Sequence, residues 1–389
     1  MLPAASTVVG PADELSAAAR GNTSLGRTAA PALWIFVWTR VAIWVGAAVT
    51  VLAFESSLNP ERGRWDSERL HELGRLVDVW ARWDSDWYLK IAAEGYSWPS
   101  STPAFFPLYP LLVGGIGRLL ADHYLLAGVL ISLGATGAAF VVLHRLALLR
   151  LGADGARRAV LYLALFPTAL FLGAVYSEAL FLLLALACFA LAERQRFGPA
   201  GVAAGLALLT RPAGVALVAA LALFAWAAPR RVDALLRAAT APALFLLYPI
   251  ALWLWIGRPL AFLDAQETVW RRSLSPYGPL GGVWDALANP PALELAFLAA
   301  VLALGVHAWR RFGAPYGVYA LVIVALPLAA PAEGRPLLSI TRFALVAFPV
   351  VLALADLGAR RWAHLAALTV CTTWLAVSVI QWARWEWVA

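Results

Sequence analysis

Long apolar runs, separated by short charged intervals, dominate this sequence. A helix that spans a bilayer needs about 20 mostly apolar residues. Because lipid offers no partners to backbone N–H and C=O groups, such runs fold as helices that satisfy these groups internally. The sequence therefore predicts an all-α polytopic membrane protein with a bundle of about 11 transmembrane helices. The expected spans are Ala32–Phe54, Tyr124–Leu143, Val160–Val175, Ala179–Leu191, Ala200–Leu209, Ala213–Ala228, Ala238–Ile256, Ala292–Trp309, Tyr316–Ala330, Phe343–Leu357 and Ala363–Trp382.

The composition supports this class and excludes others. Hydrophobic residues make up 62% of the chain, whereas soluble domains are roughly half apolar. The net charge of +7 comes almost entirely from arginines beside the apolar runs. Such clusters indicate topology and contact with anionic lipid, and we expect no nucleic-acid partner. Cys188 and Cys371 both lie inside apolar runs, which predicts neither a disulfide nor a metal pair.

Arginine clusters also predict the orientation of the chain, because positive charge marks the cytoplasmic side of a membrane protein. If the cluster from His144 to Arg158 is inside, only one crossing separates it from the end of the first span. Ala104–Leu120, which proline and glycine interrupt, is then a re-entrant or surface segment. We expect a cytoplasmic amino terminus and an external carboxyl terminus in the plasma membrane. The arginine pairs that this topology places inside are Arg230/Arg231, Arg310/Arg311 and Arg360/Arg361.

The first external loop is the longest polar interval, and we expect surface helices at Leu70–Trp80 and Tyr88–Glu94 within it. The amino-terminal residues are rich in alanine, serine, threonine and glycine, which is typical of a disordered segment. The expected units are a disordered cytoplasmic tail at residues 1–30, a single transmembrane domain at 31–389, and, within that domain, external loops at 55–123 and 257–291.

Asp84 and Asp86 lie two residues apart in this first loop, between Arg82 and Lys90 and among aromatic rings. A sugar on a polyprenyl phosphate leaves a weakly basic phosphate that needs no proton, whereas the acceptor hydroxyl needs a general base. One carboxylate therefore suffices, unlike the acid and base pair of glycoside hydrolysis. The pair predicts the active site of a glycosyltransferase with a lipid-phosphate donor. A solvated loop or helix cap is the structural alternative.

Other ionisable residues gather at the external ends of the predicted helices. Such residues are costly at membrane depth unless they are paired or face a wet cavity, so they are candidates for a functional site. The phosphate needs cations or helix N-termini, and we rank Arg342 first and Arg211 second for this role. The structural alternatives are a helix cap at Tyr176–Glu178, a snorkelling arginine at Arg211 and an Arg342–Glu333 ion pair.

Two residue types predict no chemistry of their own. The five histidines are scattered without metal-ligand spacing, so we expect no obligatory metal and no other cofactor. Most of the 19 tryptophans are typical of the aromatic belts at membrane interfaces. We include Trp382, Trp385 and Trp387 in that interpretation.

Several short motifs follow one another along the chain: Arg82–Ala92, Glu94-Gly95-Tyr96, Ala104–Leu112, Leu165–Thr168, Val175–Glu178, Leu209–Gly214, Arg342-Phe343 and Phe348-Pro349. Their order resembles the PIG-V family, which comprises the second mannosyltransferase of glycosylphosphatidylinositol synthesis and its prokaryotic relatives. The resemblance implies a GT-C fold, a polyprenyl-phosphate mannose donor, inversion at the anomeric carbon and a catalytic aspartate at Asp84. The chain departs from the family at Ser85-Asp86-Trp87, where Ala-Glu-His is frequent.

These observations together predict an integral-membrane inverting mannosyltransferase. We expect a monomer whose acceptor is a glycolipid or a lipid-linked glycan. A lipid or glycolipid transporter or flippase, and a non-catalytic subunit of a membrane glycosylation complex, are the alternatives. The predicted catalytic residues are Asp84 and Asp86. The predicted donor-phosphate residues are Arg342, Arg211, Arg271, Arg272 and Lys90. The predicted substrate pocket contains Arg82, Trp83, Trp87, Tyr96, Phe106, Tyr109, Tyr176 and Glu178.

Overall fold

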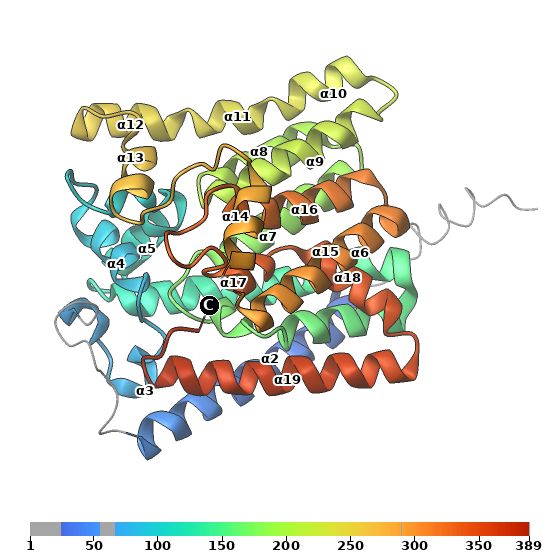
Figure 1. The fold of residues 1–389 in the computed structure, drawn as a ribbon, viewed down its shortest axis with the longest axis horizontal. Coiled ribbons are helices and arrows are strands. Elements are labelled where there is room, and N and C mark those ends of the chain that lie inside the picture. Colours follow the sequence, from blue (N-terminus) through green and yellow to red (C-terminus); the bar gives the residue numbers. More distant parts are fainter. Residues whose placement is uncertain (1–24, 55–66, 289, 389) are drawn as a thin grey trace, which may run out of the picture.

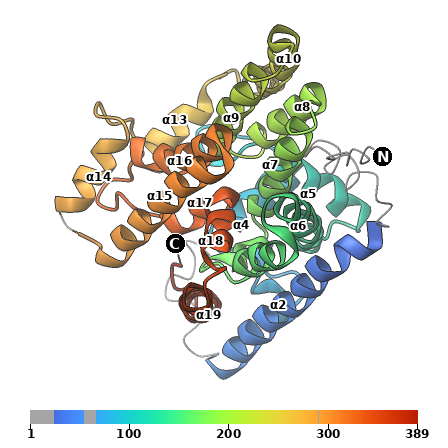
Figure 2. The same ribbon diagram turned by 90° about the vertical axis from the view of Figure 1, so that its right-hand side faces the viewer.

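The structure is a computed structural model that describes residues 25–54, 67–288 and 290–388. The described chain folds into helices that lie side by side along one direction (Figure 1). Viewed along that direction, α6 and α18 lie near the centre, and α2, α10 and α14 lie at the periphery (Figure 2). The longer helices are α2 (Leu25–Ala53), α6 (Tyr124–Ala164), α15 (Ala292–Phe312) and α19 (Arg361–Ala383), together with the consecutive α10 (Arg231–Ala238), α11 (Thr240–Phe245) and α12 (Leu247–Ile256).

Shorter helices complete the bundle and the surface that covers one of its ends. Apolar helices of intermediate length are α5 (Leu108–Leu119), α7 (Glu178–Ala192), α8 (Phe197–Leu208), α9 (Val215–Trp226), α16 (Ala314–Ala329) and α18 (Phe348–Leu357). The remaining helices are α3 (Arg75–Asp78), α4 (Ser85–Glu94), α13 (Ala261–Thr268), α14 (Pro279–Ala288) and α17 (Ile340–Ala344), with 3-10 turns at Glu68–Leu70, Thr102–Ala104, Ala169–Leu172 and Pro212–Gly214.

The prediction of an all-α membrane protein is confirmed for the described residues. Five helical stretches are long and apolar enough to cross a membrane, and the apolar helices of 10–17 residues accompany them. The number of about 11 crossings stays a prediction, because several of the shorter helices are below the roughly 20 residues that one crossing needs. The expected loop at 257–291 contains two helices, α13 and α14.

One predicted span, Val160–Val175, is wrong. Helix α6 ends at Ala164, and residues 165–177 follow as a buried segment with only a short 3-10 turn. Arg40 of α2 donates hydrogen bonds to the carbonyls of Ala164 and Ala169, at 3.0 and 2.7 Å. Non-helical backbone at membrane depth is tolerated where protein covers it and satisfies its polar groups, and the buried Arg40 supplies part of that satisfaction.

Two boundaries near the amino terminus also differ from the predictions. The expected helix Leu70–Trp80 is broken at Gly74, whose φ of 87° suits glycine, and only α3 remains helical. Residues 25–30, expected in the disordered tail, belong to α2; residues 1–24 and 55–66 lie outside the described residues. The helix expected at Tyr88–Glu94 is confirmed and begins three residues earlier, as α4.

The surface helices gather at one end of the bundle. Figure 1 shows α3, α4, α5 and α13 at that end, and α10 with the start of α19 at the opposite end. Helix α5 packs against α4 so closely that a Cβ on Gly114 would lie 2.8 Å from the Ala92 carbonyl oxygen. Its 12 residues reach about 18 Å, less than the roughly 30 Å of a hydrocarbon core. This arrangement agrees with a non-spanning α5.

Candidate active site

Asp84 lies directly before α4, in a turn whose backbone is strained. The preceding residue, Trp83, has a φ of 54°, and a bulky residue in this left-handed region costs on the order of 1–3 kcal/mol. The Tyr176 hydroxyl holds the turn from both sides, because it accepts the Asp84 N–H and donates to the Arg82 carbonyl, both at 3.1 Å. The turn therefore fixes the direction in which the Asp84 side chain leaves the backbone.

Tryptophans from the end of α19 and beyond cover the other side of this turn. The Trp83 ring packs edge-on against Trp385 and Trp387, with ring centroids 5.8 and 5.3 Å apart. Trp382 donates its indole N–H to the Val79 carbonyl at 2.7 Å. Trp382 and Trp385 are 1% and 8% exposed, so the prediction that they belong to an interfacial belt is wrong.

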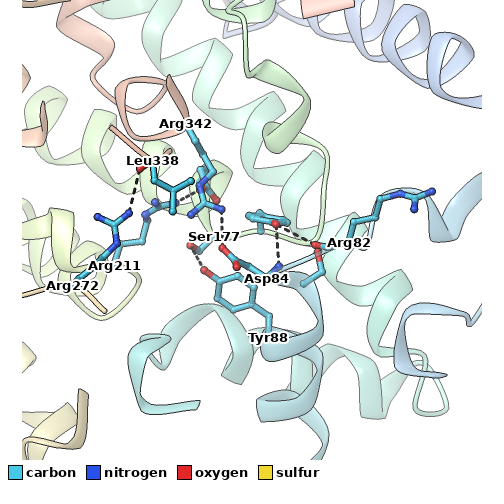
Figure 3. A network of polar contacts seen from close by, with 11 residues as sticks. Arg82, Asp84, Tyr88, Ser177, Arg211, Arg272, Leu338 and Arg342 are labelled. Carbon is cyan, nitrogen blue, oxygen red and sulfur yellow. Dashed lines mark hydrogen bonds and ion pairs between the residues drawn. The ribbon is translucent and has the colours of Figure 1, made fainter. Parts of the chain in front are cut away.

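Arg82 points away from the Asp84 carboxylate, as Figure 3 shows. Its guanidinium donates to the Ala383 carbonyl at 3.1 Å and lies 4.2 Å from the centre of the Trp385 ring. The cation therefore ties the turn to α19, and its position gives no support to the predicted place in the substrate pocket.

The Asp84 carboxylate belongs to a buried ion network of four side chains. Arg342 of α17 donates from Nη1 to Asp84 Oδ2 at 2.8 Å, and its Nε lies 3.5 Å from Glu178 Oε1. Arg211, at the turn before α9, pairs with the same Glu178 oxygen. Figure 3 shows Arg211 and Arg342 converging on this region from different elements. The structure thus brings together residues that the sequence separates by as many as 258 positions.

Two carboxylates and two guanidiniums balance their charges inside the protein. The side chains are only 1–11% exposed, and buried charges of this kind are tolerated only when they are paired. Glu178 is the first residue of α7, where the helix N-terminus favours a negative charge. Arg211 and Arg342 both lie against Oε1 of Glu178, so the charge of this buried carboxylate is paired inside the protein.

Two tyrosines line the network from the side of α4 and α5. The Tyr88 hydroxyl lies 2.9 Å from Ser177 Oγ, and the Tyr109 hydroxyl lies 3.0 Å from Ser132 Oγ. Burial, followed by the negative charge of Glu178, raises the pKa of Tyr88 above its usual range. Tyr88 is therefore a neutral hydrogen-bonding group at physiological pH, and sequence analysis did not single it out.

Arg272 lies beside the network but binds no carboxylate among the described residues. It donates to the carbonyls of Ala330 and Leu338, at 3.1 and 3.2 Å. Burial, reinforced by the nearby positive charge of Arg342, lowers the pKa of Arg272 to about 10, so this guanidinium remains charged at neutral pH. Because carbonyls carry no net charge, the positive charge of Arg272 is not cancelled by its bonding partners.

The neighbouring Arg271 is different, because it is largely exposed. It lies 3.6 Å from Glu333, with both side chains about three-quarters exposed. The structural alternative of an Arg342–Glu333 pair is therefore wrong: Glu333 faces Arg271, and Arg342 faces Asp84.

Asp86 does not share the network of Asp84. Its Oδ1 accepts a hydrogen bond from Arg69 Nε at 3.1 Å and another from the Ser67 hydroxyl. Its side chain is 20% exposed. Lys90, on the same helix, lies 5.9 Å from the centre of the Trp87 ring. The two carboxylates of the sequence motif therefore have separate partners.

The predicted pocket residues divide into three groups. Tyr109, Tyr176 and Glu178 lie at the network described above. Arg82 and Trp83 face the end of α19, as described above. Trp87, Tyr96 and Phe106 join an aromatic cluster, in which Tyr96 donates to the Phe105 carbonyl at 2.8 Å. Within it, Trp87 stacks on Phe105 and Phe106 packs against Tyr248, with ring centroids 6.1 and 5.0 Å apart.

A cavity of about 730 Å³, within the usual range for small-molecule sites, is lined by none of the four network side chains but by neighbours of two of its elements. It lies between the start of α15, the outer part of α19 and residues 331–341. Thr341, next to Arg342, and Trp387, which packs on Trp83, form part of its wall. Glu294, Trp374 and Gln381 line it further along, and no sequence motif marked these three residues.

Solved structures similar to this chain include the oligosaccharyltransferase of Archaeoglobus fulgidus. Its complex with zinc and sulfate is 14% identical, with 89% of this chain and 53% of that chain covered and a TM-score of 0.42. Its complex with an inhibitory peptide and a dolichol-phosphate is 13% identical, with 90% and 56% covered and the same TM-score. The chain spans about half the length of these structures. No curated protein matches the chain.

The sequence profile of one family does match. The profile described as Mannosyltransferase (PIG-V) covers residues 55–240. This range contains Asp84, Tyr176, Glu178 and Arg211, whereas Arg342 comes after it. The resemblance found in the motifs is thereby confirmed over residues 55–240: this is a membrane protein with a mannosyltransferase (PIG-V) family region.

Proposed function

We propose that this protein is an inverting mannosyltransferase that moves mannose from polyprenyl-phosphate mannose to a glycolipid or a lipid-linked glycan. The observation that carries the proposal is the buried Asp84 carboxylate, fixed by a strained turn and paired with Arg342. The family region supports the choice of sugar. The cavity lined by Thr341 and Trp387 supports it further, because Trp387 packs on Trp83 of the Asp84 turn.

Asp84 is the general base of the proposed reaction. Its Oδ2 is held by Arg342, which leaves Oδ1 to take the proton of the acceptor hydroxyl. The hydroxyl oxygen then forms a bond to the anomeric carbon as the opposite bond, to the phosphate oxygen, breaks. The phosphate leaves with the electron pair and needs no proton, and attack from the opposite face inverts the anomeric centre.

Arg272 is the best candidate for the donor phosphate. Arg342 and Arg211, which sequence analysis ranked higher, already face Asp84 and Glu178. Arg272 is bound to two uncharged carbonyls and is close enough to feel the charges of Arg342 and Asp84. A guanidinium has five N–H donors, so Arg272 retains donors for a phosphate. Because this cation supplies the required charge, an obligatory metal is not part of the proposal, and full activity in chelator is the expected result.

The proposed active site faces the outside of the plasma membrane, and the amino terminus is cytoplasmic. The arrangement in Figure 1 supports this orientation, since the start of α19, beside Arg360 and Arg361, lies at the end of the bundle opposite α4. Single cysteines test it. Ser275→Cys should react with an impermeant maleimide on intact cells, whereas Ala153→Cys and Ala234→Cys should react only after permeabilisation. External labelling of Ala153→Cys would contradict this topology.

A transfer assay with purified protein tests the proposed activity. Liposomes would contain the protein, radiolabelled polyprenyl-phosphate mannose and a total lipid extract as the source of acceptor. We expect label in a new glycolipid, and no transfer from GDP-mannose or from polyprenyl-phosphate glucose. Movement of intact donor between leaflets without bond cleavage would instead show a transporter. Activity that requires another protein chain would indicate a subunit of a larger complex.

A further inference from the structure

Glu178 is a carboxylate with no open path to a substrate. It is 1% exposed, begins α7, and has Arg211 and Arg342 against the same oxygen. A carboxylate enclosed in this way does not bind a sugar hydroxyl, which was its predicted role in the pocket. Any effect on chemistry must act through the two guanidiniums.

We propose that Glu178 is a positioning residue that keeps Asp84 basic by sharing the charge and the orientation of Arg342. This inference rests on the proposed function, because it assigns a role in the proton transfer to Asp84. Arg342 bridges the two carboxylates through different nitrogens, Nη1 toward Asp84 and Nε toward Glu178. Glu178 therefore determines where the guanidinium lies and how much of its charge Asp84 experiences.

The charged groups around Asp84 show how removal of the Glu178 charge would affect it. The groups around it are Tyr88 from α4, Tyr176 and Glu178 at the start of α7, Arg211 before α9, Arg272 before α14 and Arg342 on α17. The two tyrosines are neutral, so three cations face Asp84 and Glu178. Without the Glu178 charge, Asp84 alone faces all three. A carboxylate in a more positive environment binds a proton less readily and is a weaker general base.

Glu178→Gln tests this inference through the pH dependence of turnover. We expect maximal turnover to fall by about tenfold, because the base is weaker. We also expect the acidic limb of the pH–rate profile to move to lower pH by about one unit, the direction caused by adding net positive charge near a carboxylate. A purely structural defect would lower the rate without moving the limb, and that result would overturn the proposal.

Two further variants keep the test independent of folding defects. Glu178→Gln/Arg211→Gln removes one charge of each sign, so the acidic limb should return close to its wild-type position. Glu178→Asp keeps the charge and should leave the limb in place even if turnover falls. The charge argument would be contradicted if the acidic limb moved in Glu178→Gln and did not move back in Glu178→Gln/Arg211→Gln. Absence of transfer by the wild-type protein would instead refute the proposed function as a whole, and thermal unfolding monitored by size-exclusion would confirm that each variant is folded.

Discussion

Helix α7 carries a glutamate at each of its ends, and the two residues have opposite environments. Glu178 begins the helix, is almost fully buried and contacts two arginines. Glu193 follows the last helical residue and is 18% exposed. Its Oε1 accepts hydrogen bonds from Arg150 and from the Tyr316 hydroxyl, and the Arg150 guanidinium lies 4.6 Å from the centre of the Tyr316 ring.

The difference separates an ion cluster that links helices from one that contains the proposed general base, Asp84. At Glu193, donors surround the carboxylate although the C-terminal end of a helix disfavours its charge. At Glu178, the helix end favours the charge, and two guanidiniums lie against one carboxylate oxygen, of which Arg342 is also bound to Asp84. Substitutions at the two ends of the bundle should therefore affect different properties.

Asp84→Asn should produce the largest effect on activity. The amide preserves the shape of the side chain but cannot accept a proton, so we expect turnover to fall by about 10²–10⁴-fold. The melting temperature should fall, because Arg342 loses a buried anionic partner. Steady-state transfer with radiolabelled donor, at a temperature where the variant is fully folded, measures the loss of turnover. Near-normal turnover would show that Asp84 is not the general base. It would also show that the ion clusters at the two ends of α7 do not differ in function.

Arg272→Ala should have the next largest effect. Losing a charge-assisted hydrogen bond of about 1.5–3 kcal/mol would raise the donor KM by roughly 10- to 100-fold. The matched control is Arg271→Ala, because Arg271 is exposed and paired with exposed Glu333; its KM should change by less than about threefold. Equal changes of donor KM in the two variants would show that Arg272 does not bind the donor phosphate.

Asp86→Asn should change turnover only modestly. Asp86 pairs with the partly exposed Arg69 and not with the Asp84 network. Ion pairs near the surface contribute about 0.2–1 kcal/mol, so turnover should fall by less than about fivefold. A loss as large as that of Asp84→Asn would mean that both carboxylates act directly on the substrate.

Glu193→Gln should affect stability and leave activity nearly unchanged. We expect the free energy of unfolding to fall by about 1 kcal/mol, because a charged acceptor becomes a neutral one. Thermal unfolding and transfer rates of the same preparation measure both quantities. A change in the pH–rate profile of this variant would contradict the separation of the two clusters.

The fold class and much of the network could be predicted from local sequence. Apolar runs predicted the helices, since their length and composition determine how they meet lipid. The interruption of Ala104–Leu120 by proline and glycine, together with the arginine pattern, favours a segment that does not span, and this stays a prediction. The external polar clusters predicted that Asp84, Tyr176, Arg211 and Arg342 lie near one another, because only one face of the membrane is available to them.

The pairing within the site could not be predicted in the same way. Whether Arg342 faces Asp84, Glu178 or Glu333 depends on how α17 packs, and no local pattern encodes a contact across 258 residues. The end of α6 was missed for a similar reason: the segment 165–177 is as apolar as a helix, and Arg40 on another helix satisfies its carbonyls. Trp385 has the sequence context of an interfacial residue, but in the structure it packs on Trp83 of the Asp84 turn.

The contacts between that turn and α19 also determine when the site can exist. Val79 and Arg82 bind Trp382 and Ala383, about 300 positions later in the chain. At 5–20 residues per second, a ribosome needs roughly 15–60 s to make the intervening polypeptide. During that interval the first loop is already made, but the Asp84 turn lacks the contacts that Trp382 and Ala383 provide. The observed geometry of this turn can therefore form only after α19 has been made.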